Sequence, residues 1–166
     1  SIKECDVEAD ALIDFTVSKI TDMVLDQCTQ KGLALVLATT GLSEEQLAHV
    51  KEAGKTIPIV QSYNMSLGIN TLAKIVELIT PVLADAGFDI EIVERHHRRK
   101  LDAPSGTAIM LGNAANKSLN GEYHFVFDRS ERREKRDPKE IGFSAVRGGT
   151  IVGVHDVIYA GEDEVI

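Results

Sequence analysis

Short apolar runs separated by polar, helix-forming stretches make up the first third of the chain. Three of these runs, at residues 11–16, 33–37 and 57–60, predict strands, because brief continuous apolar runs are typical of strands buried on both faces. Helices are predicted between them, at about 21–30 and 43–54, and the second begins with a capping-box pattern. This order of strands and helices indicates a parallel, doubly wound sheet of the Rossmann type.

Helical periodicity replaces this pattern after residue 66. Apolar residues recur at helical spacing over residues 70–86, which predicts a long amphipathic helix whose apolar positions are explained by core packing. Residues 88–94 alternate as a half-buried strand, and a second helix is expected at about 105–119. Further strands are expected at 123–127, 143–147 and 150–159. Gly148 and Gly149 favour a hairpin between the last two.

These patterns divide the chain near residue 66. Residues 1–66 are expected to form part of a doubly wound domain, in which ligands bind beyond the carboxyl ends of the parallel strands. Residues 67–166 are expected to form an open α+β unit with a mixed sheet and helices on one face. The predicted fold class is therefore α/β, a partial Rossmann-like sheet followed by an α+β domain.

The densest chemistry lies at the end of the strand predicted at 88–94. His96 and His97 have the side-chain type whose ordinary pKa lies nearest neutrality, and the basic residues of the stretch 95–100 favour bound anions. Neighbouring residues of a strand point to opposite faces. One histidine could therefore take part in chemistry while the other binds or packs.

A helix start follows this basic stretch. Pro104 disfavours helix at the residue before it, Ser105 can cap, and Gly106 and Thr107 open the helix. The amino end of a helix presents unpaired N–H groups and a positive partial charge, and Gly106 has no side chain to obstruct an anion. The sequence thus predicts a carboxylate or phosphate site made of backbone amides.

Composition excludes several classes of protein. The chain of 166 residues is 43% hydrophobic and 27% charged, which is ordinary for a globular protein, and its net charge of −8 argues against a general nucleic-acid binder. Cys5 and Cys28 have no metal-ligand spacing and fit a reducing cytosol. No apolar run approaches membrane-spanning length and no signal peptide is recognised. A soluble, cytoplasmic protein is expected, without nucleic-acid or membrane partners.

Two further groups of polar residues have simpler interpretations. The second basic cluster, 129–136, interleaves Glu131 and Glu134, which is typical of a solvated loop or helix. Isolated histidines are more often surface or hydrogen-bonded sheet residues than ligands, and this applies to His49, His124 and His155.

A metal site made of His96, His97 and Asp102 is a rival interpretation of the histidine cluster. It is weak, because adjacent histidines on a strand diverge and no further ligand stands at a familiar spacing. No metal is expected.

The order His-His-x-x-Lys-x-Asp-Ala-Pro-Ser-Gly-Thr-Ala from His96 onward resembles the dihydrodipicolinate reductase family, also called 4-hydroxy-tetrahydrodipicolinate reductase. The resemblance implies a reductase that uses NADPH or NADH on a cyclic dicarboxylate in the diaminopimelate route to lysine. It also implies that His96 and Lys100 donate protons and that His97, Gly106 and Thr107 hold a substrate carboxylate. The cofactor would carry the hydride while the protein orients the substrate.

Segments after the second and third predicted strands are similar to those that line the nicotinamide cofactor in this family. The cofactor-contacting positions implied by this resemblance are Ala38, Thr39, Thr40, Ser62, Tyr63, Asn64 and Met65. Ala38 replaces the glycine usual in the family, and its methyl group could crowd the cofactor. Residues 147–149 and 152–155 also resemble the family, but Val154 stands where glutamate is common.

The glycine-rich pyrophosphate loop of a dinucleotide-binding domain does not occur before residue 11. The chain thus resembles the family without its opening βαβ unit, and it stops within what reads as a strand. Residues 1–66 are expected to be a partial dinucleotide-binding domain and 67–166 a substrate-binding domain whose sheets assemble a homotetramer. The alternative is a non-catalytic fragment that retains only oligomerisation and dicarboxylate binding.

Overall fold

The structure is a computed structural model that describes residue 2 and residues 4–166. The chain divides into two compact units, Ser1–Met65 and Ser66–Ile166, and this boundary lies one residue before the predicted one. Each unit is described by itself.

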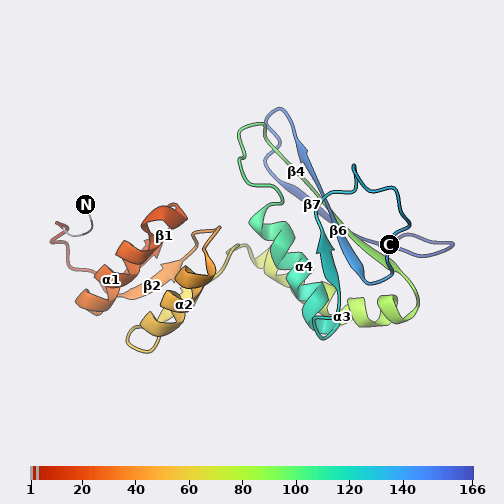
Figure 1. The fold of residues 1–166 in the computed structure, drawn as a ribbon. Coiled ribbons are helices and arrows are strands. Elements are labelled where there is room, and N and C mark those ends of the chain that lie inside the picture. Colours follow the sequence, from red (N-terminus) through yellow and green to blue (C-terminus); the bar gives the residue numbers. More distant parts are fainter. Residues whose placement is uncertain (1, 3) are drawn as a thin grey trace. The chain divides into compact units, whose positions relative to one another are not determined.

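The first unit contains a three-stranded parallel sheet in the order β1-β2-β3 (Figure 1). Its elements are β1 (Ala11–Asp14), a 3-10 turn η1 (Ser18–Ile20), α1 (Thr21–Lys31), β2 (Ala34–Leu37), α2 (Glu44–Ala53) and β3 (Ile59–Gln61). The predicted parallel sheet and the capping box at Ser43 are confirmed, because the Ser43 hydroxyl and the Gln46 side chain each bond the other's backbone N–H. β3 begins only after Pro58, which cannot donate to a ladder.

Both helices of this unit pack on one face of the sheet. Leu35 and Leu37 of β2 are fully buried in the same cluster as residues of α1 and α2. Side chains of opposite parity lie on the other face, where Ile13 is 66% and Val60 60% exposed. The unit therefore has one covered and one open sheet face.

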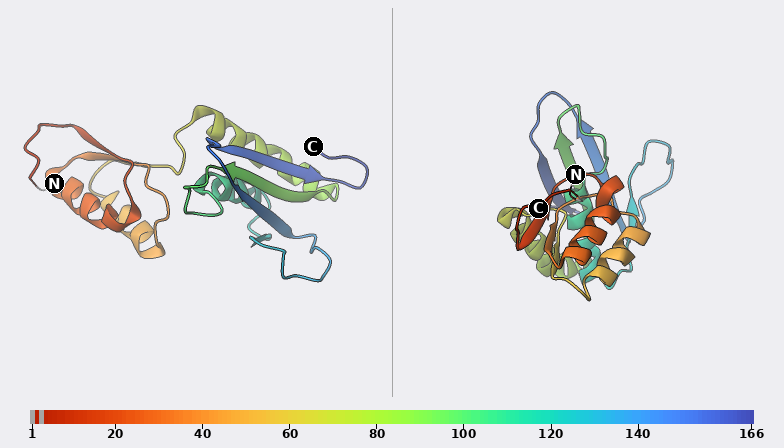
Figure 2. Two further views of the ribbon diagram at one scale, coloured as in Figure 1. Left: turned by 90° about the horizontal axis from the view of Figure 1, so that it is seen from above. Right: turned by 90° about the vertical axis from the view of Figure 1, so that its left-hand side faces the viewer.

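The second unit contains a four-stranded mixed sheet in the order β5-β6-β4-β7. Its elements are α3 (Leu67–Asp85), β4 (Asp89–His96), α4 (Gly106–Ser118), β5 (His124–Val126), β6 (Glu140–Arg147) and β7 (Val154–Ala160). β7 runs antiparallel to β4, and the remaining pairs are parallel. The predicted mixed sheet with helices on one face is confirmed, since α3 and α4 pack on the same side (Figure 2).

The predicted hairpin at Gly148 and Gly149 is wrong. β6 and β7 do not pair with each other, because β4 lies between them and pairs with both. Glycines indicate where the chain reverses, but they do not determine which strand fills the space between the arms. The connection 148–153 consequently crosses the carboxyl end of β4.

The core of this unit lies between the sheet and the two helices. Ile90 and Ile92 of β4 are fully buried against α4 residues, and Phe143 of β6 is 4% exposed. Gly112 of α4 faces that ring so closely that a Cβ there would lie 2.5 Å from the Phe143 Cζ atom. A glycine at this helix position therefore lets the sheet and helix approach, which fixes the distance between β6 and α4.

The explanation of α3 by core packing holds for only one of its faces. Val76 is buried and Leu72 packs on the core, whereas Ile75, Leu78 and Val82 are 46%, 65% and 69% exposed. The helix begins at Leu67, earlier than predicted. By length and composition alone, α3 is long and apolar enough to cross a membrane, so the expectation that no apolar run approaches this length is also wrong. The core helix of a soluble protein passes the same test, and a single such helix is weak evidence for a transmembrane segment.

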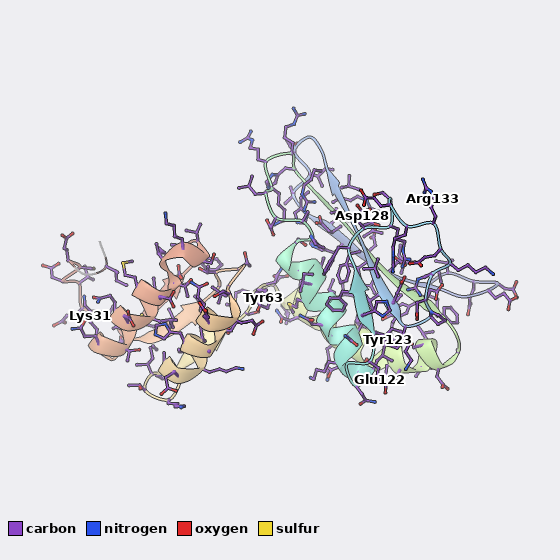
Figure 3. The ribbon with its side chains drawn as sticks, viewed as in Figure 1. Lys31, Tyr63, Glu122, Tyr123, Asp128 and Arg133 are labelled. Carbon is purple, nitrogen blue, oxygen red and sulfur yellow. The ribbon has the colours of Figure 1, made fainter. Side chains whose placement is uncertain are left out.

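The second basic cluster is a loop, as one of the two predicted possibilities, but it is not simply solvated. Arg129 and Arg132 pair with Glu140, whose side chain is almost fully buried, while Arg133 points away from the sheet (Figure 3). Arg136 pairs with Glu91 of β4 at 3.0 Å. Burial raises the pKa of Glu140, but hydrogen bonds from the two arginines outweigh it and lower that pKa to about 2. Ion pairs with Glu91 and Glu140 thus hold the loop 129–136 against the sheet.

Candidate active site

Alternation along β4 places a carboxylate and a histidine on the face that carries the core. Ile90 and Ile92 are buried there, and Glu94 and His96 follow at the same parity, 1% and 9% exposed. The strand runs two residues further than predicted and ends at His96. His97 therefore lies in the following loop rather than on the opposite face of the strand.

Glu94 is the hub of a buried polar network. Its Oε1 accepts from the Arg147 Nη2 at 2.7 Å and from the Ser105 backbone N at 3.1 Å. Its Oε2 accepts from the Arg147 Nη1 at 2.7 Å and lies 2.5 Å from the His96 Nδ1. β4, β6 and the start of α4 thus meet on one carboxylate. Burial raises the pKa of Glu94, but the Arg147 and His96 hydrogen bonds outweigh it and leave the pKa below its ordinary value.

A second histidine, His155 of β7, stands beside this network. It is opposite Glu94 in the strand register, and its ring meets that of His96 edge to face at a centroid distance of 5.1 Å. Its Nε2 lies 2.8 Å from the Ser105 Oγ, which also accepts the Ala108 N–H as the cap of α4. Burial lowers the pKa of His155. The expected hydrogen-bonded sheet histidine is confirmed, but its place beside His96 was not anticipated.

Lys100 and Asp102 form an ion pair in the loop between β4 and α4. The Lys100 Nζ lies 2.8 Å from the Asp102 Oδ1, and the Asp102 carbonyl accepts from the Arg147 Nη2 at 2.5 Å. Burial is the main cause of the lowered pKa of His155, and the positive charges of His96 and Lys100 lower it further. The loop is thereby tied to the same arginine that holds Glu94.

The rival metal site gains no support from this geometry. The Asp102 carboxylate is engaged by Lys100, and the His96 Nδ1 by Glu94. Among residue 2 and residues 4–166, no group of three histidine, cysteine or acidic side chains is placed to hold a metal ion. His97 also leaves the strand and does not converge with His96 on one point.

The structure brings together only some of the residues expected to hold a substrate carboxylate, which are His97, Gly106 and Thr107. Ser105 caps α4, and Gly106 and Thr107 form its first turn, as expected. His97 instead lines a cavity of about 240 Å³ together with Arg99, Gly149 and Thr150, and neither Gly106 nor Thr107 contributes to it. The His97 Nδ1 is buried without a hydrogen-bond partner in the described part of the chain. The structure therefore brings His97 to the crossing loop rather than to the helix.

The loop 148–153 covers the carboxyl end of β4, beside the loop that follows His96 (Figure 1). The Gly148 N–H donates to the His96 carbonyl at 2.9 Å, and the Arg98 N–H donates to the Gly149 carbonyl at 3.3 Å. A Cβ at Gly153, which has φ +154°, would lie 3.1 Å from the His96 Nε2. Glycine at this position is thus what leaves room beside the ring.

Val154, which stands where the resemblance implies glutamate, does not leave Arg95 unpaired. Val154 lies opposite Arg95 in the β4–β7 register, and the Arg95 Nη2 reaches Asp156 at 2.6 Å. Both partners are substantially exposed, so this pair adds little stability. It nevertheless gives the guanidinium a partner, and β4 and β7 pair in register through this position.

In the first unit the predicted cofactor positions follow β2 and β3. Thr39 is 2% exposed and its hydroxyl donates to the buried Asp14 at 2.9 Å, so its side chain serves the fold. Thr40 is exposed, and the Ser62 hydroxyl is engaged with the Asn64 backbone. The remaining positions, Ala38, Tyr63 and Met65, are partly or largely accessible, and Figure 3 shows Tyr63 on the segment that leaves β3.

Besides the position of His155, sequence reasoning missed Glu94 and Arg147 as members of the site in the second unit. Glu94 and Arg147 were each read as the last residue of a predicted strand, although they are joined by two hydrogen bonds of 2.7 Å across 53 residues. A signal for Glu94 was present, since it continues the parity of Ile90 and Ile92 into the core and a carboxylate there needs a cation.

Two family profiles together match nearly the whole chain. The family described as "Dihydrodipicolinate reductase, C-terminus" matches residues 68–166, and "Dihydrodipicolinate reductase, N-terminus" matches residues 1–65. A 4-hydroxy-tetrahydrodipicolinate reductase of Caldanaerobacter subterraneus subsp. tengcongensis is 52% identical over 99% of the chain. One of Clostridium novyi is 45% identical over all of it. The chain spans 65% of the length of each of these relatives.

Solved structures agree on the fold. A dipicolinate-bound dihydrodipicolinate reductase from Paenisporosarcina sp. TG-14 matches with a TM-score of 0.64 at 23% identity. The match covers 95% of this chain and 60% of the Paenisporosarcina chain. A probable dehydrogenase from Thermotoga maritima matches with a TM-score of 0.55 at 11% identity, covering 57% of its own chain. On the strength of the family matches and the sequence identities, the chain belongs to the dihydrodipicolinate reductase family.

Proposed function

We propose that this chain serves the reduction of 4-hydroxy-tetrahydrodipicolinate to tetrahydrodipicolinate by NADPH or NADH, in the diaminopimelate route to lysine. The observation that carries the proposal is the 52% identity, over 99% of the chain, to a protein named for this activity. The chain's own contribution is the cluster at the carboxyl end of β4, where a buried histidine stands beside a lysine and a capped helix start.

Proton delivery is assigned to His96 and Lys100. Hydride addition to a C=C or C=N bond leaves a negative charge that must be protonated, and a histidine or lysine can supply that proton near neutral pH. His96 is held by Glu94 on one side of its ring, and Lys100 adds positive charge to the loop above it. The nicotinamide cofactor, when bound, supplies the hydride.

Binding of the substrate carboxylates is assigned to His97, Gly106 and Thr107. The first turn of α4 offers backbone N–H groups and the positive end of the helix dipole, while His97 and Arg99 line the cavity under the crossing loop. These are two separate anion-binding features, and a dicarboxylate presents two anions. The dipicolinate-bound state of the Paenisporosarcina protein supports a ligand of this class.

The nicotinamide end of the cofactor is assigned to the edge formed where β2 and β3 end. Ala38, Thr39, Thr40, Ser62, Tyr63, Asn64 and Met65 make up this edge. The backbone N–H of Ala38 bonds the Asp14 carbonyl at 2.8 Å, so its methyl and carbonyl are the groups left to face a ligand. The exposed Thr40 hydroxyl and the backbone of this edge offer neutral groups of the kind a carboxamide needs, whereas the Thr39 hydroxyl is held by Asp14. These seven residues include no glycine-rich turn for a pyrophosphate.

A homotetramer of cytoplasmic location completes the proposal. The face of the second sheet opposite α3 and α4 carries Val146 and Val154, which are 45% and 43% exposed, beside the Arg95–Asp156 pair. A mixed apolar and charged face of this kind suits pairing of sheets between subunits. Sedimentation of the purified protein measures the subunit number.

The alternative function is a non-catalytic fragment that keeps dicarboxylate binding and oligomerisation. Within the described residues, the edge of the first sheet has no glycine-rich turn to bind two phosphates, which favours this alternative for residues 1–166 when they are tested by themselves. We expect the 166-residue chain to bind NADPH poorly and to turn over slowly. A fluorescence titration with NADPH followed by a turnover assay tests this. Micromolar affinity with ordinary turnover would show that the loop is dispensable and would remove the alternative.

Two histidine variants of a family protein that carries these residues and is active separate the proposed roles. His96→Ala should lower kcat by roughly 100- to 10,000-fold, because the proton is needed as charge develops in the transition state. His97→Ala should mainly raise the KM for the dicarboxylate. Steady-state kinetics distinguish the two results, and the opposite pattern would exchange the two assignments.

A further inference from the structure

A single buried carboxylate joins the histidine proposed to move a proton to the rest of the second unit. Glu94 is 1% exposed and receives donors from the side chains of Arg147 and His96 and from the Ser105 backbone. Each oxygen has two such donors, so the acceptor capacity of a carboxylate is filled. A group satisfied from three separate elements has no freedom to reorient.

The protonation state of this carboxylate determines which nitrogen of His96 carries a proton. An ionised carboxylate has no proton to donate and can only accept, so the Nδ1 at 2.5 Å must be the donor. The bidentate Arg147 guanidinium, with both contacts at 2.7 Å, keeps Glu94 ionised. Neutral His96 consequently has its proton on Nδ1 and its lone pair on Nε2.

The opposite edge of the ring is the edge that can meet a substrate. The His96 Nε2 has no hydrogen-bond partner among the described residues, and it faces Gly153, where a Cβ would come within 3.1 Å. The side chain retains 11% exposure. The arrangement therefore leaves one nitrogen fixed and the other available.

We propose that Glu94 is a positioning residue that fixes His96 in the Nδ1–H form and directs its Nε2 toward the substrate, with Arg147 as the clamp that holds Glu94. The inference rests on the proposed function and adds residues to it. In the proton-transfer step, the Nε2–H bond of cationic His96 breaks and the proton passes to the reduced substrate. His96 is left neutral with its remaining proton on Nδ1, still bonded to Glu94, and solvent restores the second proton.

The first test measures the tautomer directly and needs no activity. Long-range ¹H–¹⁵N spectra of the ¹⁵N-labelled chain, with the His96 signals identified by their loss in His96→Gln, should show neutral His96 protonated on Nδ1. Glu94→Gln keeps the size of the side chain but offers both a donor and an acceptor, so the Nε2–H form should become populated. Neutral His96 protonated on Nε2 in the unsubstituted chain would overturn the proposal, whether or not the variant folds.

The second test is kinetic and is made in an active family protein that carries these residues. Glu94→Gln should lower kcat by roughly 10- to 100-fold, by analogy with removal of the partner that orients a metal-binding histidine. The KM for the dicarboxylate should change little, because binding is assigned to other groups. A matched control is Glu140→Gln, another carboxylate that is 1% exposed and paired with arginines, in β6 of the same unit.

The control separates positioning from general weakening of the fold. Glu140→Gln should leave the His96 spectrum and kcat unchanged, and an equal fall in kcat for both variants would overturn the positioning role. Failure of the proposed function is recognised differently. If His96→Ala left kcat unchanged in the active protein while His96 still showed its Nδ1 proton and responded to Glu94→Gln, the proton-donating assignment would fail and the Glu94–His96 pairing would stand.

Discussion

The two units hold their candidate residues by different means. In the first, the buried Asp14 is bonded to hydroxyls of Thr16 and Thr39, so neutral groups close to the strand ends shape the edge. In the second, Glu94 is bonded to a guanidinium 53 residues away and to an imidazole. In the second unit, charged side chains from separate strands therefore hold the histidine that is proposed to move protons. In the first unit, neutral hydroxyls hold the carboxylate beside the edge that is proposed to contact a nicotinamide. The difference predicts unequal responses to the loss of one partner.

The largest effect is expected from Arg147→Met. It leaves the buried Glu94 without its cation, and breaking a buried ion pair from one side costs about 3–5 kcal/mol of the free energy of unfolding. Urea denaturation followed by circular dichroism measures the loss. Arg133→Met, at an exposed arginine of the same unit, is the control and should stay within about 0.5 kcal/mol of the parent. A loss below about 1 kcal/mol for Arg147→Met would show that the clamp is not a major source of stability.

A smaller effect is expected when the helix start is obstructed. Gly106→Val places a side chain where an anion approaches the first N–H groups of α4, and should weaken binding of pyridine-2,6-dicarboxylate by about 1–3 kcal/mol. Isothermal calorimetry measures the affinity. Gly68→Ala, in the first turn of α3, serves as the control with no expected change. Unchanged affinity in Gly106→Val would exclude this turn from the carboxylate site.

In the first unit, Thr39→Val tests how much the neutral hydroxyl that is bonded to Asp14 contributes to stability. It removes one hydrogen bond to Asp14 while nearly preserving volume, and should lower the free energy of unfolding by about 1–2 kcal/mol. The exposed neighbour offers Thr40→Val as the matched control, with no resolved change expected. A loss as large as that of Arg147→Met would mean that the two units do not differ in the way proposed.

The smallest effect concerns acid solution. The pKa of Glu140 is about 2 in the folded chain against an ordinary 4.5, so its contribution to stability is present above about 4.5 and is lost as the pH falls toward 2. Glu140→Gln should therefore flatten the decline of stability over this range relative to the parent. Thermal melts between those pH values provide the measurement, and parallel declines in the two proteins would contradict the prediction.

The elements were predictable because burial repeats with the period of the local structure. Parity along β4 and the capping residues Ser43 and Ser105 were sufficient to place strands and helix starts within a few residues. The hairpin at Gly148 was mispredicted because turn residues do not specify strand order. The exposed stripe of α3 was mispredicted because apolar residues do not show whether a face is covered.

The site was predictable only where its parts are contiguous in sequence. His96, Lys100 and the turn at Gly106 belong to one motif, whereas the pairing of Glu94 with Arg147 depends on parallel strands that meet only in the folded sheet. Charge at a position can be read from a sequence, but its partner cannot when many cations are available. For the same reason, the loop arginines that fasten onto Glu140 were taken as solvated.

The crossing of β4 by the loop 148–153 bears on how variants of this protein should be chosen. Strands in a sheet are about 4.8 Å apart, so the loop must span about 10 Å to pass from β6 to β7, and its hydrogen bond to the His96 carbonyl fixes where it crosses. Insertions are usually directed to glycine-rich surface loops, where they are tolerated. Here a single added residue would displace Gly153 from the His96 ring. A mutational library designed to alter His96 should therefore include residues 148–153, which are distant from it in sequence but lie against it in the fold. A library designed to improve solubility should leave these residues unchanged.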